Sequence, residues 1–160
     1  MQQDSFLLYG ANGYTGRLVA RYAAQNGLRP VLSGRRAEAL APLASELGLT
    51  YRVVDLNDAE GLDALLSEHD VVLHAAGPFQ YTAPQMVEAC LRTGTHYLDI
   101  NGDIEVFEML KGYDAAGKER GVMIMPGVGF DVVPTDCLSL FLKKQLPDAT
   151  HLKLAFTALG

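Results

Sequence analysis

The sequence contains no tryptophan, only two cysteines and no long apolar run. Cys90 and Cys137 lie far apart, so they form neither a CxxC pair nor a metal-ligand spacing, and such sparse cysteines suit a reducing compartment. No apolar stretch approaches the roughly 20 residues of a membrane-spanning helix. The first residues lack the positively charged region of a signal peptide. These absences predict a soluble cytoplasmic domain with no membrane span and no metal site.

Basic residues are scarce as well. Thirteen lysines and arginines face 19 acidic residues, which leaves a net charge of -6 at pH 7. This balance argues against nucleic acid or an anionic membrane as the main partner. Hydrophobic residues at 49% and charged residues at 20% describe an ordinary globular protein. The length of 160 residues fits one domain with a substantial core.

Short apolar runs alternate with helical patterns along the chain. The runs predict strands at residues 6–9, 30–33, 50–54, 71–75, 96–99 and 122–125. Helices are predicted at 17–25, 40–47, 58–66, 82–93, 104–120 and 135–145. This alternation is typical of βαβ units. It predicts an α/β fold, a Rossmann-type doubly wound parallel sheet of about six strands in the order 3-2-1-4-5-6, with helices on both faces.

The first predicted strand runs into a turn with three glycines at three-residue spacing. Gly10 permits a tight bend, Gly13 lets the main chain approach a pyrophosphate, and Gly16 allows helix and strand to pack closely. The free N–H groups at the helix start then face the phosphates. The turn residues predicted to bind a dinucleotide are Gly10, Asn12, Gly13, Tyr14, Thr15 and Gly16. The alternative is a tight strand-to-helix turn that binds nothing.

The second predicted strand ends in Ser33-Gly34-Arg35-Arg36. NAD sites usually place an acidic residue about 20 residues after the glycine turn, where it holds the ribose hydroxyls. That acid is missing here, and arginines suit a dianionic phosphate because they form charge-assisted, often bidentate, hydrogen bonds. We therefore predict NADP rather than NAD, with Arg35 and Arg36 on the 2′-phosphate and Ser33 and Gly34 in the same site. The alternative is two solvated arginines at a helix start.

The third and fourth strand ends add further candidates. Asp55 either accepts a hydrogen bond from the adenine amino group or holds its own turn without a ligand. Small residues after the fourth strand let the backbone pass beside the ribose and nicotinamide. The predicted cofactor contacts here are Ala75, Ala76, Gly77, Pro78 and Phe79. His74, just before them, is interpreted as a packed strand residue rather than a catalyst.

The last two strand ends carry acidic residues and glycines. Two carboxylates, Asp99 and Asp103, can perform acid/base chemistry. We favour a structural interpretation, in which Asp103 caps the next helix and Asp99 holds the turn. The loop after the sixth strand is expected beside the nicotinamide ring. Its predicted contacts are Gly129, Phe130 and Asp131. Cys137 begins the last helix without a paired histidine, so it is interpreted as a packed thiol rather than a nucleophile.

Taken together, these strand ends resemble the N-terminal NADP-binding domain of the saccharopine dehydrogenase-like family. The resemblance covers nearly the whole chain. It rests on Gly-Ala-Asn-Gly-Tyr-Thr-Gly at 10–16, Ser-Gly-Arg-Arg at 33–36, Ala-Ala-Gly-Pro-Phe at 75–79, Tyr-Leu-Asp-Ile-Asn-Gly-Asp at 97–103 and Gly-Phe-Asp-Val-Val-Pro-Thr-Asp at 129–136. Asp103 stands where that pattern leads us to expect Glu. The resemblance implies an NADP-dependent oxidoreductase that transfers hydride between nicotinamide and a substrate held by a second domain.

The resemblance also divides the chain. Residues 1–150 are expected to form the NADP-binding domain, and residues 151–160, which contain a strand-like run at 151–156, to begin a substrate domain otherwise absent from the chain. The fragment alone is expected to be inactive, a homodimer is possible, and no catalytic residue is assigned. The family includes imine chemistry on saccharopine or polyamine-type substrates and enoyl reduction on lipids, and the sequence does not choose between them.

Two other interpretations share the fold. A non-catalytic NADP-binding sensor would keep the glycine turn and the arginines but need no substrate domain. An atypical short-chain dehydrogenase-like protein would share the sheet, but its Tyr-x-x-x-Lys pair is missing, since the nearest candidates, Tyr113 and Lys118, are five residues apart.

Overall fold

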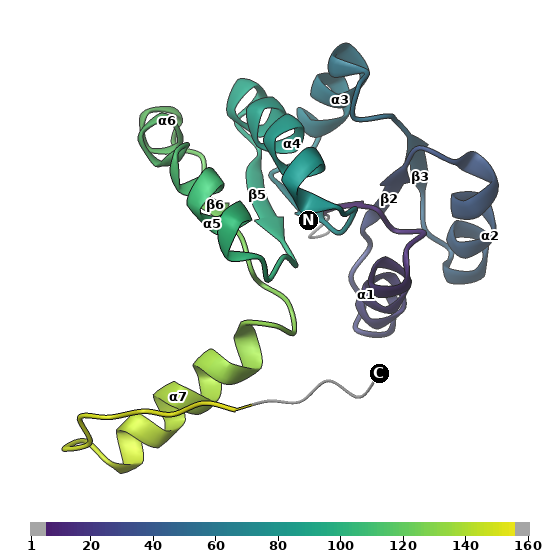
Figure 1. The fold of residues 1–160 in the computed structure, drawn as a ribbon. Helices are drawn as coiled ribbons and strands as arrows, with labels where there is room; N and C mark the ends of the chain where they lie inside the picture. Colours follow the sequence, from purple (N-terminus) through teal and green to yellow (C-terminus); the bar gives the residue numbers. More distant parts are fainter. Residues whose placement is uncertain (1–5, 156–160) are drawn as a thin grey trace.

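The computed structural model describes residues 6–155, which form one parallel sheet with helices on both faces (Figure 1). The six strands lie in the order β3-β2-β1-β4-β5-β6, and every pairing is parallel. Their bounds are β1 Leu7–Tyr9, β2 Val31–Gly34, β3 Tyr51–Val53, β4 Val71–His74, β5 His96–Asp99 and β6 Ile124–Met125. This confirms the predicted fold class and strand order, although β3 and β6 are shorter than predicted.

Helices α1 to α6 connect consecutive strands, and α7 follows β6. Their bounds are α1 Tyr14–Gln25, α2 Ala37–Leu47, α3 Ala59–Leu66, α4 Phe79–Thr93, α5 Ile104–Lys111, α6 Asp114–Arg120 and α7 Val133–Gln145. Helices α1 and α2 cover one face, where Leu8 and Leu32 of the sheet meet Ala20 and Leu40. Helices α3, α4 and α5 cover the other face.

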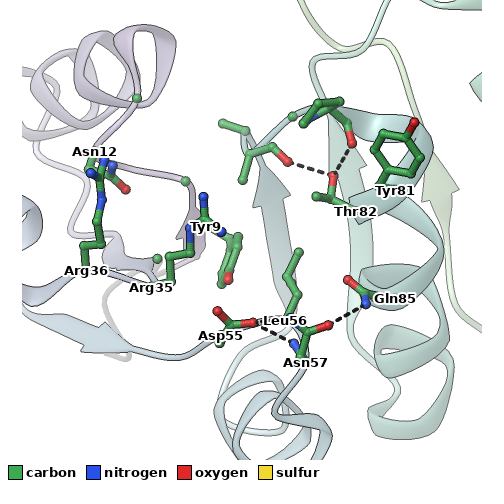
Figure 2. A pocket seen from close by; sticks show the side chains of 17 residues that line it. Tyr9, Asn12, Arg35, Arg36, Asp55, Leu56, Asn57, Tyr81, Thr82 and Gln85 are labelled. Carbon is green, nitrogen blue, oxygen red and sulfur yellow. Dashed lines mark hydrogen bonds between the residues drawn. The ribbon is translucent and has the colours of Figure 1, made fainter.

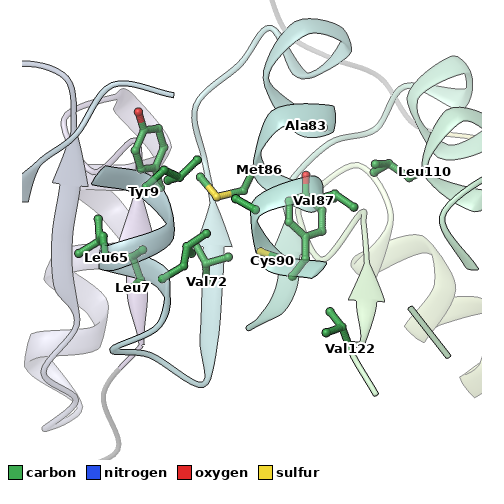
Figure 3. Close-up of a cluster of buried hydrophobic side chains, with 14 of the residues drawn as sticks. Leu7, Tyr9, Leu65, Val72, Ala83, Met86, Val87, Cys90, Leu110 and Val122 are labelled. Carbon is green, nitrogen blue, oxygen red and sulfur yellow. The ribbon is translucent and has the colours of Figure 1, made fainter. Parts of the chain in front are cut away.

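The second face holds the larger core (Figure 3). Leu7, Val72 and Tyr97 of the sheet pack there against Met86 and Cys90 of α4. Because successive strand residues point to opposite faces, Leu7 and Leu8 enter different clusters. Both faces of the sheet are therefore buried, so its polar edge at the carboxyl ends of the strands is the place where a ligand can reach it.

Several helices differ from the sequence prediction, and α1, α2 and α7 each begin two or three residues earlier than predicted. Helix α4 begins at Phe79 rather than Thr82, because Pro78 takes an extended conformation as N-cap and Phe79 turns its ring against His74, with centroids 5.4 Å apart. The predicted helix at 104–120 is broken into α5 and α6. Gly112 and Tyr113 donate to the carbonyls three residues back, at 3.1 and 3.0 Å, which tightens and ends α5.

The C-terminal part of the described chain stands away from the sheet (Figure 1). Helix α7 has no buried residue, and Cys137 on it is exposed. The interpretation of Cys137 as a packed thiol was therefore wrong. The residue pattern of α7 does not indicate whether the helix packs against the sheet, so this exposure could not be predicted from it. Residues 151–155 form no strand, which corrects that prediction, and residue 156 lies outside the described residues.

Candidate functional site

The carboxyl ends of β1, β2, β3 and β4 surround a cavity of about 510 Å³ (Figure 2). Its walls come from the glycine turn, the loops after β2, β3 and β4, and the first turns of α4. The lining residues are Tyr9, Gly10, Asn12, Gly13, Gly34, Arg35, Arg36, Asp55, Leu56, Asn57, Ala75, Ala76, Gly77, Pro78, Tyr81, Thr82 and Gln85. Eleven of the residues predicted from sequence to bind the cofactor are thereby brought to one place.

Two glycines of the turn are required by the protein itself. Gly10 has φ +87°, and a Cβ there would lie 2.7 Å from the backbone of Ala75 and Ala76. A Cβ on Gly16 would collide with the carbonyl oxygen of Gly10 and lie 2.8 Å from Ala11 Cα. These glycines allow β1, α1 and the loop after β4 to approach closely, as the spacing predicted.

Gly13 is different. It has φ -72°, which any residue adopts, and a Cβ there would touch only Gly10 O, at an ordinary 3.4 Å. Neither backbone conformation nor packing within the protein demands a glycine at this position. It lines the cavity. The close approach of a ligand to the main chain is the remaining physical reason for its missing side chain.

The helix starts around the sheet edge fall into two groups. Asp58 caps α3 by accepting from Gly61 N–H at 3.0 Å, and Asp103 caps α5 by accepting from Glu105 N–H at 2.9 Å. Helices α1, α2 and α4 have no side-chain cap at their N-cap residues Gly13, Arg36 and Pro78. Helices α6 and α7 also lack a side-chain cap but lie away from the cavity, whereas Gly13, Arg36 and Pro78 all line it. The free N–H groups and positive dipole ends of α1, α2 and α4 favour an anion there.

Positive charge adds to this field beside β2. Arg35 and Arg36 are exposed, line the cavity and have no ion-pair partner within residues 6–155. Two unpaired guanidinium groups next to the positive end of α2 repel one another and the helix dipole, so a bound phosphate would relieve both effects. Tyr9, the last residue of β1, donates from its hydroxyl to Val54 O at 2.9 Å. Burial, and secondarily the charge of Asp55, raises the pKa of Tyr9 to about 12.

The turn after β4 is held by a buried histidine. The Thr82 hydroxyl donates to Ala76 O at 2.7 Å and lies 3.0 Å from His74 Nε2. The Thr82 hydroxyl proton goes to the carbonyl, so His74 Nε2 must carry a hydrogen and donate to the Thr82 oxygen. His74 Nδ1 has no hydrogen-bond partner. Burial lowers the pKa of His74 to about 3, which keeps the ring neutral. This confirms the interpretation of His74 as a packed strand residue.

Asp99 is fully buried and holds the loops after β5 and β6. Its Oδ1 accepts from the N–H groups of Asn101 and Gly127 at 2.9 and 2.8 Å, and its Oδ2 accepts from the Tyr97 hydroxyl at 2.7 Å. Burial, reinforced by this carboxylate, raises the pKa of Tyr97. Together with the Asp103 cap, these contacts confirm the structural roles predicted for the two acids.

Some predicted residues lie outside the cavity lining. Tyr14, Thr15 and Gly16 form the first turn of α1, Ser33 is buried beneath the glycine turn, and Phe79 packs on His74. The loop residues Gly129, Phe130 and Asp131 lie beyond β6, where Gly129 approaches Ile100 and Phe130 is 84% exposed. Their contact with a cofactor stays a prediction.

The sequence analysis missed six lining residues, although most of them follow a predicted site residue directly or lie together on one helix. They are Tyr9, Leu56, Asn57, Tyr81, Thr82 and Gln85. Leu56 and Asn57 directly follow the predicted Asp55. Tyr81, Thr82 and Gln85 lie within one turn of each other on α4, so placing the start of that helix three residues too late removed the first of them from view.

The sheet order, the glycine turn and the uncapped helix starts define a dinucleotide-binding Rossmann domain. Comparison with known proteins then identifies the family. The chain matches the family described as "Saccharopine dehydrogenase NADP binding domain" over residues 6–125 and belongs to it. This confirms the family predicted from the strand ends and NADP as the cofactor.

Similar proteins include the saccharopine dehydrogenase-like oxidoreductase of Bos taurus, 27% identical over 91% of this chain and 39% of that protein. The trans-acting enoyl reductase of Mycobacterium leprae is 34% identical over 84% of this chain and 34% of that protein. The chain thus spans about two fifths or less of the length of these relatives. Their names place it in an oxidoreductase family.

A solved structure with the same fold is apo saccharopine dehydrogenase (L-Glu forming) from Saccharomyces cerevisiae. It superposes with a TM-score of 0.78 at 20% identity, over 90% of this chain and 31% of that one. At this identity the likeness concerns the fold alone. Within residues 6–155, no helix has the length and apolar character needed to cross a bilayer.

Proposed function

We propose that this chain is the cofactor-binding part of an NADP-dependent oxidoreductase and that its cavity holds the dinucleotide. The observation that carries the proposal is the coincidence of three uncapped helix starts, the unpaired Arg35 and Arg36, and a Gly13 that the protein itself does not need. A ligand that meets all three must bring negative charge close to the main chain and a further anionic group to β2.

The residues present fit NADP in a definite orientation. The start of α1 would hold the pyrophosphate, Arg35 and Arg36 the 2′-phosphate, and Asp55 the adenine amino group. The backbone of Ala76 and Gly77, fixed through Thr82, would border the nicotinamide half. The cofactor supplies hydride exchange at the nicotinamide ring. The protein's part is to bind and orient it.

The substrate would be held by sequence beyond this chain, since the relatives are more than twice as long. We propose hydride transfer to or from a small molecule bound there, with the isolated chain inactive. The relatives' names include an enoyl reductase and saccharopine dehydrogenase-like oxidoreductases, so both substrate classes belong in the first screen. Cytoplasmic location and a homodimer stay predictions.

Calorimetric titration with NADPH and NADH tests the cofactor site. We expect tighter binding of NADPH, and loss of that preference in the Arg35→Ala, Arg36→Ala double variant. Arg120→Ala removes an exposed arginine at the end of α6, outside the cavity, and serves as the matched charge control. Failure of the chain to bind NADPH at millimolar concentration, or equal binding of both nucleotides, would contradict the proposal.

A further inference from the structure

Asp55 belongs to a short relay of side chains that crosses the end of the cavity (Figure 2). Asn57 donates twice to the same carboxylate oxygen, Asp55 Oδ1, from its backbone N–H at 2.9 Å and from its side-chain Nδ2 at 2.8 Å. Gln85 of α4 then donates from Nε2 to Asn57 Oδ1 at 3.2 Å. The relay joins the loop after β3 to a helix on the far side of the cavity.

The direction of each hydrogen bond in the relay is fixed. An ionised carboxylate only accepts, so the Asn57 amide must turn its NH₂ group toward Asp55 and its oxygen toward Gln85. Gln85 must in turn present its NH₂ group. Two donors occupy Asp55 Oδ1, whereas Asp55 Oδ2 accepts no hydrogen bond from the described residues. The relay therefore leaves one acceptor, held in one orientation, beside the cavity.

Neither Asn57 nor Gln85 is needed to complete the fold at this point. Asn57 is exposed and Gln85 partly buried, and the hydrogen bond between them joins elements 28 residues apart at the surface. The Asp55 turn is already closed by the Asp58 N–H, which donates to Asp55 O at 3.0 Å. The backbone N–H of Asn57 already holds Asp55 Oδ1, and the side chains of the relay add a second restraint on the rotation of the Asp55 carboxylate.

We propose that Asn57 and Gln85 are positioning residues that aim Asp55 Oδ2 at the 6-amino group of adenine and make the site select a 6-amino purine over a 6-oxo purine. The proposal rests on the proposed function, since it concerns the adenine end of the same cavity. Hypoxanthine presents an oxygen at position 6, which would face the fixed acceptor without a proton between them. It also carries a proton on N1, which a carboxylate free to turn could reach.

The restraint is thus what produces selectivity. With the relay intact, the hypoxanthine analogue of the cofactor leaves two acceptors facing each other, and its binding falls by about tenfold or more. With the relay broken, Asp55 turns toward N1–H and accepts the analogue. Loss of a positioning residue therefore lowers discrimination between the bases, which a mere loss of stability would not do.

The experiment compares the dissociation constants of NADP⁺, its hypoxanthine analogue (nicotinamide hypoxanthine dinucleotide phosphate) and NAD⁺ by calorimetry. We expect the parent chain to prefer adenine by about tenfold or more. Gln85→Ala and Gln85→Glu should reduce this preference several-fold, the second because a carboxylate cannot donate to Asn57. Gln80→Ala, an exposed position on α4 outside the cavity, is the matched control and should keep the preference. The preference for NADP⁺ over NAD⁺ should persist in all of them.

The Asp55→Asn variant tests the direction of the relay. Asn57 would still donate to the oxygen at position 55, so the new NH₂ group would face the base and favour the 6-oxo purine. We expect the base preference to invert. Equal binding of both bases by the parent chain, or an unchanged preference in Gln85→Ala, would overturn the inference while leaving the proposed function intact. Failure to bind any of the three nucleotides would contradict both.

Discussion

Replacement by alanine should affect different properties at two glycines of the same turn, folding stability at Gly16 and ligand binding at Gly13. Alanine at position 16 places a methyl group against the carbonyl oxygen of Gly10 and 2.8 Å from Ala11 Cα, so backbone rather than a flexible side chain must move. Alanine at position 13 meets only Gly10 O at 3.4 Å. The first change therefore acts on the fold, and the second acts on whatever occupies the cavity.

The expected losses of stability and of NADPH affinity differ clearly between the two variants. Overpacking against backbone costs up to about 3 kcal/mol, and alanine returns about 1 kcal/mol through helix propensity and a less flexible unfolded chain. Gly16→Ala should thus lose about 2 kcal/mol, which lowers the melting temperature by about 4–8 °C in a domain of this size. Gly13→Ala at the N-cap should stay within about 1 kcal/mol of the parent. Losing one charge-assisted hydrogen bond of about 1.5–3 kcal/mol would weaken its NADPH binding about 10- to 150-fold.

The assay is thermal unfolding of both variants, followed by NADPH titration of those that fold at 25 °C. Gly27→Ala is unsuitable as a control, because Gly27 has φ +81° and would be strained. Gly77→Ala is the informative third variant, since Gly77 also lines the cavity and its Cβ would meet Phe79 only at 3.5 Å. Unchanged NADPH affinity in Gly13→Ala would refute the argument from ligand approach. Unchanged stability in Gly16→Ala would refute the argument from packing.

Three further outcomes follow from the site. The Arg35→Ala and Arg36→Ala single variants should each weaken NADPH binding more than NADH binding, measured calorimetrically, because only NADPH carries the 2′-phosphate. Since His74 is neutral when folded and its pKa falls from 6.5 to about 3, the unfolded chain takes up the proton first, so stability is complete above pH 6.5 and falls by about 1.4 kcal/mol per pH unit below it. Urea unfolding between pH 6.5 and 5 should show this slope in the parent and lose it in His74→Phe; an equal slope in both would contradict the assignment. Asp99→Ala strands three buried donors and should cost at least about 3 kcal/mol in the same urea assay, and a loss below about 1 kcal/mol would show that the loops re-pair them.

Much of the fold was predictable because its signals are local. The apolar runs of β1 and β4 are short and bounded by turn residues, and their alternation with helical patterns admits few topologies. The caps Asp58 and Asp103 and the glycine turn are also local features. The position of Gln85 relative to Asp55 was not predictable, since it depends on how α4 lies across the sheet edge and not on any spacing in the sequence.

The sequence predictions that were wrong can also be explained from the structure. The start of α4 was misplaced because Pro78 and Phe79 look like loop residues until the packing of Phe79 on His74 is known. The break at Gly112 reflects a tightened last turn of α5, and the exposure of Cys137 reflects the position of α7 away from the sheet. For α4 and for Cys137, a tertiary contact or its absence decided what a local pattern left open.

The polarity of the cavity follows from how the chain treats its own helix ends. Where α3 and α5 start, an aspartate accepts from one free N–H group and places a negative charge at the helix end, which disfavours an external anion there. Where α1, α2 and α4 start, no side chain caps the helix, and among the described residues Asp55, whose Oδ1 accepts from Asn57, is the one acid in the cavity lining. Three uncapped helix starts, two guanidinium groups and one carboxylate acceptor therefore border the same cavity. A molecule with a pyrophosphate, a phosphate ester on its ribose and an amino group on its base matches this set of groups, whereas a simple phosphate or a neutral ligand would leave either the arginines or Asp55 without a partner.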